Sequence, residues 1–188
     1  MTYLTEIAVH NQIRAELERA QRIVISAHIR PDGDAIGSML GLAQALREQG
    51  KTIQTVLQDA VDPKYYGLAG AKDVKNSIQE PYDYLIVVDS ADRHRVGNVL
   101  DGIDEVDLVI DHHISHINFG KIDVVEPDVE ATALVLYEFM PLWGLPLSEK
   151  SAECIMTGIL ADTIGFRTSN TSPKSLRAVA DMMETGIN

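Results

Sequence analysis

The sequence predicts an α/β domain built on a mainly parallel five-stranded sheet with helices on both faces. Short apolar runs alternate along the chain with longer segments of helical periodicity, which is typical of α/β proteins. Runs such as 85–88 (LIVV) are continuously apolar, as expected for strands of a parallel sheet buried on both faces. The length of 188 residues and a hydrophobic content of 45% suit a single domain, 1–188, with its own core.

Strands and helices are expected in an order that begins with a helix and ends with one. The strands are predicted at 22–27, 52–58, 82–90, 107–113 and 121–126. The helices are predicted at 3–21, 35–49, 131–143 and 148–161, with a last helix that begins near Ser172 and Pro173. Gly50 is a typical helix stop, and a serine followed by proline is a typical helix start.

The composition narrows the classes of function. A formal net charge of −12 argues against a protein that grips long duplex nucleic acid through a broad basic surface. It leaves room for an anionic substrate at a metal site, because bound cations invert the local charge. The single cysteine, Cys154, allows no disulfide within the chain, and no secretory signal or membrane span is evident, so a cytoplasmic protein is expected.

Three predicted strands run directly into acids or imidazoles. RIVISA (22–27) leads to His28, YLIVV (84–88) leads to Asp89, and LVI (108–110) leads to the run Asp111-His112-His113. Parallel α/β sheets bind ligands beyond the carboxyl ends of their strands, so these side chains are expected at one edge of the sheet.

Two further segments extend this set. The turn after His28 carries Asp32 and Asp34 on either side of a glycine, and Asp162 follows an apolar helix. Taken alone, the first segment is also compatible with a helix-capping turn in which Asp34 is the N-cap. Taken together, carboxylates and imidazoles without a thiolate cluster indicate a dinuclear centre of hard divalent ions such as Mn²⁺.

Four segments resemble, in order and spacing, the motifs of the DHH phosphoesterase superfamily. They are HIRPDGDAIGS (28–38), VVDSAD (87–92), VIDHHISHINFG (109–120) and GILADTIGFRTSNTSP (158–173). The resemblance covers nearly the whole chain and is strongest to the nanoRNase/pAp-phosphatase (NrnA-type) branch, which is distantly related to the RecJ exonuclease.

The resemblance implies a site with two Mn²⁺ ions, with Mg²⁺ or Co²⁺ as alternatives. In this sequence His28 and Asp32 would bind one ion, His112, Asp34 and Asp162 the other, and Asp89 would bridge them. Asp111 would orient a ligand histidine, His113 would meet the scissile phosphate or help the leaving group, and Asn118 would lie in the same pocket.

Some residues near these motifs keep two interpretations. Arg30 and Arg167 are either phosphate contacts or solvated loop arginines. His116 is expected at the surface, with a site role as the lesser alternative.

The function implied by the resemblance is Mn²⁺-dependent hydrolysis of short oligoribonucleotides or 3′-phosphoadenosine 5′-phosphate (pAp), by hydroxide attack at a two-metal site. A pyrophosphatase or exopolyphosphatase-type hydrolase is the alternative, and a non-catalytic nucleotide-binding module is another. Family members usually add a C-terminal substrate-binding DHHA1 domain, whose glycine-rich segment this sequence lacks, so the chain is expected to be the catalytic half alone. The sequence is compatible with a homodimer.

Overall fold

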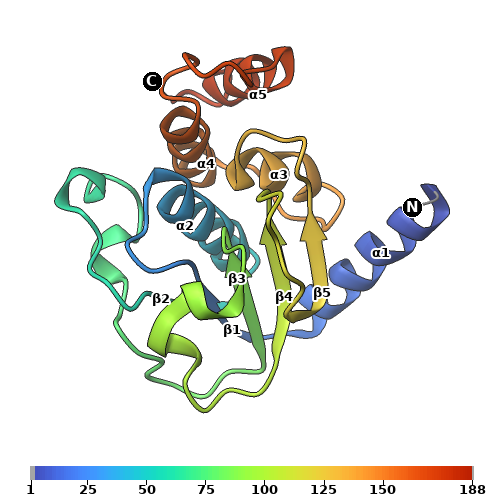
Figure 1. The fold of residues 1–188 in the computed structure, drawn as a ribbon, viewed down its shortest axis with the longest axis vertical. Coiled ribbons are helices and arrows are strands. Elements are labelled where there is room, and N and C mark those ends of the chain that lie inside the picture. Colours follow the sequence, from blue (N-terminus) through green and yellow to red (C-terminus); the bar gives the residue numbers. More distant parts are fainter. Residues whose placement is uncertain (1–2, 188) are drawn as a thin grey trace.

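Five parallel strands form one sheet at the centre of the computed structural model, which describes residues 3–187 (Figure 1). The strands are β1 (Arg22–Ser26), β2 (Thr52–Val56), β3 (Tyr84–Val88), β4 (Val106–Asp111) and β5 (Gly120–Val125). Their order across the sheet is β2-β1-β3-β4-β5, and all neighbouring pairs are parallel. The predicted α/β sheet is therefore confirmed. Residues 1, 2 and 188 of the predicted 1–188 domain lie outside the described part.

The two faces of the sheet are covered differently. The main hydrophobic core joins the sheet to five α-helices, α1 (Tyr3–Arg19), α2 (Gly33–Glu48), α3 (Thr132–Phe139), α4 (Glu149–Asp162) and α5 (Pro173–Met183). A smaller cluster on the opposite face lies under the 3-10 helix η3 (Arg93–Leu100), which Figure 1 shows in the lower half of the molecule, away from α4 and α5 at the top. None of the described helices has the length and apolar character needed to cross a membrane.

The predicted elements all occur, with ends that shift by a few residues. The helix expected at 131–143 ends at Phe139, because Pro141 has no amide hydrogen to continue the helical ladder. Three 3-10 helices were not predicted: η3, η1 (Pro63–Tyr65) and η2 (Ala71–Asp73). They are too short to leave a periodic pattern in the sequence.

Helix α2 begins in the predicted site loop and packs closely on α4. The Asp32 side chain caps it, accepting from the amides of Asp34 and Ala35 at 3.0 and 3.1 Å, so the interpretation of Asp34 as the cap is wrong. At Gly37, an added Cβ would lie 2.5 Å from the Cys154 carbonyl oxygen and 2.6 Å from the Gly158 nitrogen. The two helix backbones therefore approach closely only because residue 37 has no side chain.

This packing predicts that Gly37→Ala lowers the free energy of unfolding by about 1–3 kcal/mol, because the new methyl group meets backbone atoms of α4 that cannot rotate away. Urea unfolding followed by circular dichroism measures the change. Gly67→Ala is the matched control, since a Cβ at residue 67 has no heavy atom within 4 Å. Equal losses in the two variants would contradict the close helix contact.

Candidate metal centre

The predicted acids and imidazoles gather beyond the carboxyl ends of three neighbouring strands. His28 follows β1, Asp89 follows β3, and His112 follows β4. In the sheet, β1 lies between β2 and β3, so the chain leaves β1 and β3 in opposite directions. Open parallel sheets bind ligands at such a topological switch point.

Seven side chains form three overlapping groups at this position. The groups are His28–Asp32–Asp89, Asp34–His112–Asp162 and Asp89–His112–His113. Within each group the potential ligand atoms all lie within 4.8 Å of one another. Asp89 and His112 each belong to two groups, so the structure brings the six predicted metal ligands, and His113, into one continuous cluster.

Distances within the cluster match ligands that share an ion. His28 Nε2 lies 3.4 Å from Asp89 Oδ2 and 3.7 Å from Asp32 Oδ2. His112 Nε2 lies 3.6 Å from Asp162 Oδ2 and 3.8 Å from Asp89 Oδ1. These separations exceed ordinary hydrogen-bond lengths. Two atoms bound about 2.1 Å from one ion lie about 3.0–3.4 Å apart, so small side-chain movements would suffice for coordination.

Both imidazoles are oriented by backbone carbonyls. The Ile29 carbonyl lies 2.8 Å from His28 Nδ1, and the Val129 carbonyl lies 3.1 Å from His112 Nδ1. A carbonyl only accepts hydrogen bonds, so Nδ1 carries a proton in each ring, and Nε2 is the nitrogen that could bind a metal ion. In both histidines Nε2 faces the carboxylates, which is the arrangement that metal-binding histidines use.

The start of helix α3 holds two of the carboxylates. The Thr132 and Ala133 amides donate to the two oxygens of Asp34 at 2.6 and 2.9 Å. Asp34 thereby replaces a cap that Ala131, the residue before α3, does not supply. The Thr132 hydroxyl donates to Asp89 Oδ1 at 2.9 Å. This contact was not predicted, because it joins residues from segments far apart in the chain.

Crowding of negative charge raises the pKa values of two carboxyl groups in the cluster. Burial, reinforced by the charges of Asp89 and Asp162, raises the pKa of Asp34 well above its usual range. Burial and the charges of Asp89 and Asp32 also raise the pKa of Asp162, although His112 opposes the shift. Such repulsion disfavours the ionised carboxylates and is relieved by a cation between them. The donor set therefore fits divalent metal.

In the group His28–Asp32–Asp89, the histidine supplies positive charge that offsets part of this negative charge. Burial lowers the pKa of His28, but the facing carboxylates of Asp32 and Asp89 outweigh this effect and raise the pKa to about 10. Burial opposes ionisation of Asp32, yet the His28 contact and two backbone amides hold its pKa at about 2. Without metal, an imidazolium ion thus occupies the position between these two carboxylates.

The backbone around the site is strained. Asp89 has a φ of 54°, and the residues after Asp162 continue with three left-handed conformations, Ile164 at 51°, Gly165 at 65° and Phe166 at 65°. Left-handed geometry costs about 1–3 kcal/mol for a residue with a side chain, most of all for a branched one such as isoleucine. Thr163 holds this turn, since its Oγ1 accepts from the Phe166 amide at 3.1 Å.

The Asp111 carboxylate joins two histidines, one of which, His113, belongs to the third potential metal group. Its Oδ1 lies 2.8 Å from His113 Nδ1, and its Oδ2 lies 2.7 Å from His116 Nδ1. His116 Nε2 lies 3.1 Å from Asp123 on β5. The His116 side chain is only 3% exposed, so its expected surface position is wrong: β5 covers it with a carboxylate that sequence proximity did not suggest. The contact with Asp111 raises the pKa of His113.

The remaining predicted residues lie at or beyond the edge of the cluster. Arg30 is exposed, and its amide donates to Asp59 Oδ2 at 2.6 Å. The Arg167 side chain is exposed and donates from Nε to the Ile164 carbonyl at 2.7 Å. Asn118 lines a different cavity, of about 410 Å³, whose walls come from α1 and β5.

A parallel α/β sheet whose strand ends gather aspartate and histidine defines a class of domains with a carboxylate–imidazole metal centre. Within that class the chain belongs to the DHH family: residues 22–159 match the model of the DHH family, N-terminal domain. The resemblance predicted from the sequence is thereby confirmed.

Relatives of two kinds share this domain. The chain is 36% identical over 168 residues to a Thermus thermophilus protein named bifunctional oligoribonuclease and PAP phosphatase NrnA, covering 88% of this chain and 50% of the relative. It is 26% identical over 176 residues to a probable manganese-dependent inorganic pyrophosphatase of Bacillus cereus, covering 87% and 55%. The crystal structure of an exopolyphosphatase-related protein from Bacteroides fragilis superposes with a TM-score of 0.87 at 26% identity, covering 96% and 57%. The chain spans about half the length of the curated relatives it matches.

The cluster predicts that Mn²⁺ raises the thermal unfolding midpoint and that a chelator reverses the effect. One site at a metal concentration of a hundred times Kd contributes about 2.7 kcal/mol. Asp162→Asn should shrink this shift while leaving the metal-free protein at least as stable as wild type, because it removes a repelled charge. Differential scanning fluorimetry with and without Mn²⁺ measures both effects.

Asp104→Asn is the control for this measurement, since Asp104 is an exposed acid outside the three groups. If Asp162→Asn kept the full Mn²⁺-induced rise in the unfolding midpoint, Asp162 would not be a metal ligand.

Proposed function

We propose that this chain carries the catalytic site of a Mn²⁺-dependent phosphoesterase that hydrolyses short oligoribonucleotides or pAp at a two-metal centre. The shared position of Asp89 is the observation that carries the proposal. Its Oδ2 faces His28 of the first group, and its Oδ1 faces His112 of the second. A carboxylate presented to two adjoining groups is suited to bridge two ions.

Two of the three groups support the ligand assignment that the DHH resemblance implies. His28 and Asp32 would hold one ion, and His112, Asp34 and Asp162 the other, with Asp89 between them. Oxygen and imidazole donors favour Mn²⁺, with Mg²⁺ and Co²⁺ as alternatives. When bound, the ions supply a water-derived nucleophile at neutral pH and stabilise charge that develops on the phosphate.

The protein's own groups orient the substrate and the leaving group. Asp111 holds His113 through Nδ1 at 2.8 Å, which leaves Nε2 of His113 available to the scissile phosphate or the leaving oxygen. Arg30 and Arg167 are exposed cations on the loop before Asp32 and on the loop after Asp162, and both are available to phosphate. A DHHA1 domain, which the DHH resemblance implies, would hold the distal part of the substrate.

The bridging role predicts that Asp89→Asn abolishes Mn²⁺-dependent phosphate release from pAp. The loss should exceed the roughly 10–100-fold cost of removing an outer-shell partner. Asparagine tolerates the left-handed φ of 54° at this position, so the backbone is preserved while the charge is lost. Phosphate release in Mn²⁺ measures the rate, with Asp104→Asn as the control. A wild-type rate in Asp89→Asn would exclude a two-metal mechanism built on this residue.

A hydrolase of P–O–P linkages is the second candidate, favoured by the similarity to a protein named as a pyrophosphatase. The two are separated by kcat/KM for pAp, a dinucleotide and pyrophosphate in Mn²⁺. We expect the nucleotides to be the better substrates, and the reverse order would favour the pyrophosphatase. Nucleotide binding without any phosphate release would instead indicate a non-catalytic binding module.

A further inference from the structure

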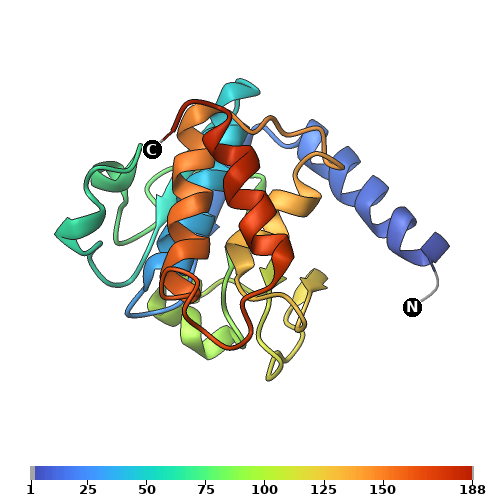
Figure 2. The ribbon, with the colours of Figure 1, turned by 90° about the horizontal axis from the view of Figure 1, so that it is seen from above.

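A recess beside the metal groups combines apolar walls with positive charge. It is a cavity of about 500 Å³, here called the η3 recess, lined by the apolar side chains of Ile29, Ile117 and Phe119 and by four charged or titratable residues at the start of helix η3, which are Asp92, Arg93, His94 and Arg95. Helix η3 and the loop that carries Ile117 lie on the same face of the sheet in both views (Figures 1 and 2).

Direct contacts connect the η3 recess to the metal groups. Ile29 follows His28 and accepts from its Nδ1, and the Ile29 amide donates to the Arg95 carbonyl at 2.6 Å. A molecule with its phosphate at the metal groups therefore reaches the η3 recess with its adjoining part.

Some of the charged or titratable side chains at the start of η3 form hydrogen bonds within the domain, and others do not. The Arg93 guanidinium donates to two backbone carbonyls at the end of η3 and just beyond it, and the Asp92 carboxylate accepts from the His94 and Arg95 amides at 2.8 and 3.1 Å. The His94 and Arg95 side chains are exposed and form no hydrogen bond or ion pair with any residue of the described chain. In a chain of net charge −12, an unpaired arginine beside a metal cluster suits an anionic ligand.

The apolar wall is exposed to solvent although its backbone is held in place. Ile117 is 68% exposed, and its amide donates to the Ala91 carbonyl at 2.8 Å. The Phe119 ring is half-buried and stacks on His116 with ring centroids 5.8 Å apart. A flat, partly apolar ligand would cover this surface, whereas an inorganic phosphate would leave it in water.

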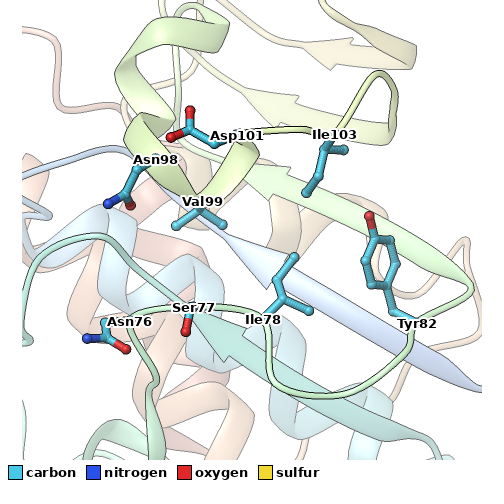
Figure 3. Close-up of a pocket in the computed structure, with 8 residues that line it drawn as sticks. All are labelled: Asn76, Ser77, Ile78, Tyr82, Asn98, Val99, Asp101 and Ile103. Atoms are coloured by element: carbon cyan, nitrogen blue, oxygen red, sulfur yellow. The ribbon is translucent and has the colours of Figure 1, made fainter.

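A second cavity at η3 has the opposite character. It measures about 420 Å³ and lies between the end of η3 and segment 76–82, where Val99 and Ile103 face Ile78 and Tyr82, and Asn98 and Asp101 also line it (Figure 3). Its lining includes an aspartate and no lysine, arginine or histidine. It therefore does not suit an anionic substrate. Asn98 offers a control position in the part of η3 that follows the kink at Gly97, whereas Arg95 precedes this kink.

We propose that the η3 recess binds the nucleoside next to the scissile phosphate, with the base against Ile117 and Phe119 and with Arg95 donating to the sugar–phosphate. The inference rests on the proposed phosphoesterase function and deepens it. It assigns the preference for nucleotides over inorganic phosphates to a surface within this domain. Base stacking on apolar and aromatic side chains, with a nearby arginine, is how proteins bind single nucleotides without reading their sequence.

Binding of AMP to the Mn²⁺-loaded protein tests the η3 recess without turnover. Isothermal titration calorimetry should show Kd rising about tenfold in Arg95→Ala, through loss of a charged hydrogen bond, and about tenfold in Ile117→Ser, through loss of apolar contact. Asn98→Ala controls for perturbation of η3, and Arg22→Ala at the opposite edge of the sheet controls for lost charge. No AMP binding by the wild type, or equal Kd values in all four variants, would overturn the proposal.

Selectivity gives a second, independent measurement. The ratio of kcat/KM for pAp to that for pyrophosphate should fall about tenfold in Ile117→Ser and stay at the wild-type value in Asn98→Ala. An unchanged ratio in Ile117→Ser, with both substrates hydrolysed, would overturn the η3 recess and leave the phosphoesterase function standing. Failure of the wild type to hydrolyse any phosphate compound in Mn²⁺ would overturn the proposed function, and the AMP titration would still decide the η3 recess.

Discussion

Negative charge that is gathered out of water at the ends of three strands is the constraint on which the rest of this structure depends. Asp34 and Asp89 are 1% and 2% exposed and repel each other, so each must be supported by donors or by a cation. Two amides of helix α3 and the hydroxyl of Thr132 provide the donors. The remaining charge makes the cluster suited to a divalent metal ion.

The scaffold is arranged to keep these carboxylates where they are. An added Cβ at Gly158 would lie 2.8 Å from Asp34 Oδ1, so the close approach of α4 that Gly37 permits also leaves room for the carboxylate. On the other side, Asp89 and the turn after Asp162 adopt left-handed conformations. Strain of this kind persists only where the surrounding packing over-determines the backbone, which is common at functional sites.

Metal chemistry and substrate choice occupy different surfaces of the domain. The metal groups would act on any phosphate that reaches them, and relatives with this domain carry the names of nucleotide and of pyrophosphate hydrolases. The η3 recess lies against the same centre but is built from a separate 3-10 helix and the loop before β5. Changes confined to these two segments would alter selectivity without disturbing the ligands, because the ligands lie on strand ends and on helices α2 and α4.

The sequence by itself determined the alternation of strands and helices and the identity of the potential metal ligands. Both are local properties: apolar periodicity defines an element, and His28, Asp89 and His112 are found because each follows an apolar strand. The DHH resemblance extended this to an assignment of ligands to two ions, and the structure places these ligands in one cluster.

Only the tertiary structure decided which groups support those ligands. The strand order places β1 beside β3, and thereby His28 beside Asp89, although about 60 residues separate them in the chain. The contacts from Thr132 to Asp89 and from Asp123 to His116, like the η3 recess, join segments whose spacing carries no periodic signal. Such pairings depend on how the elements pack together, and packing is a property of the whole chain rather than of any local pattern.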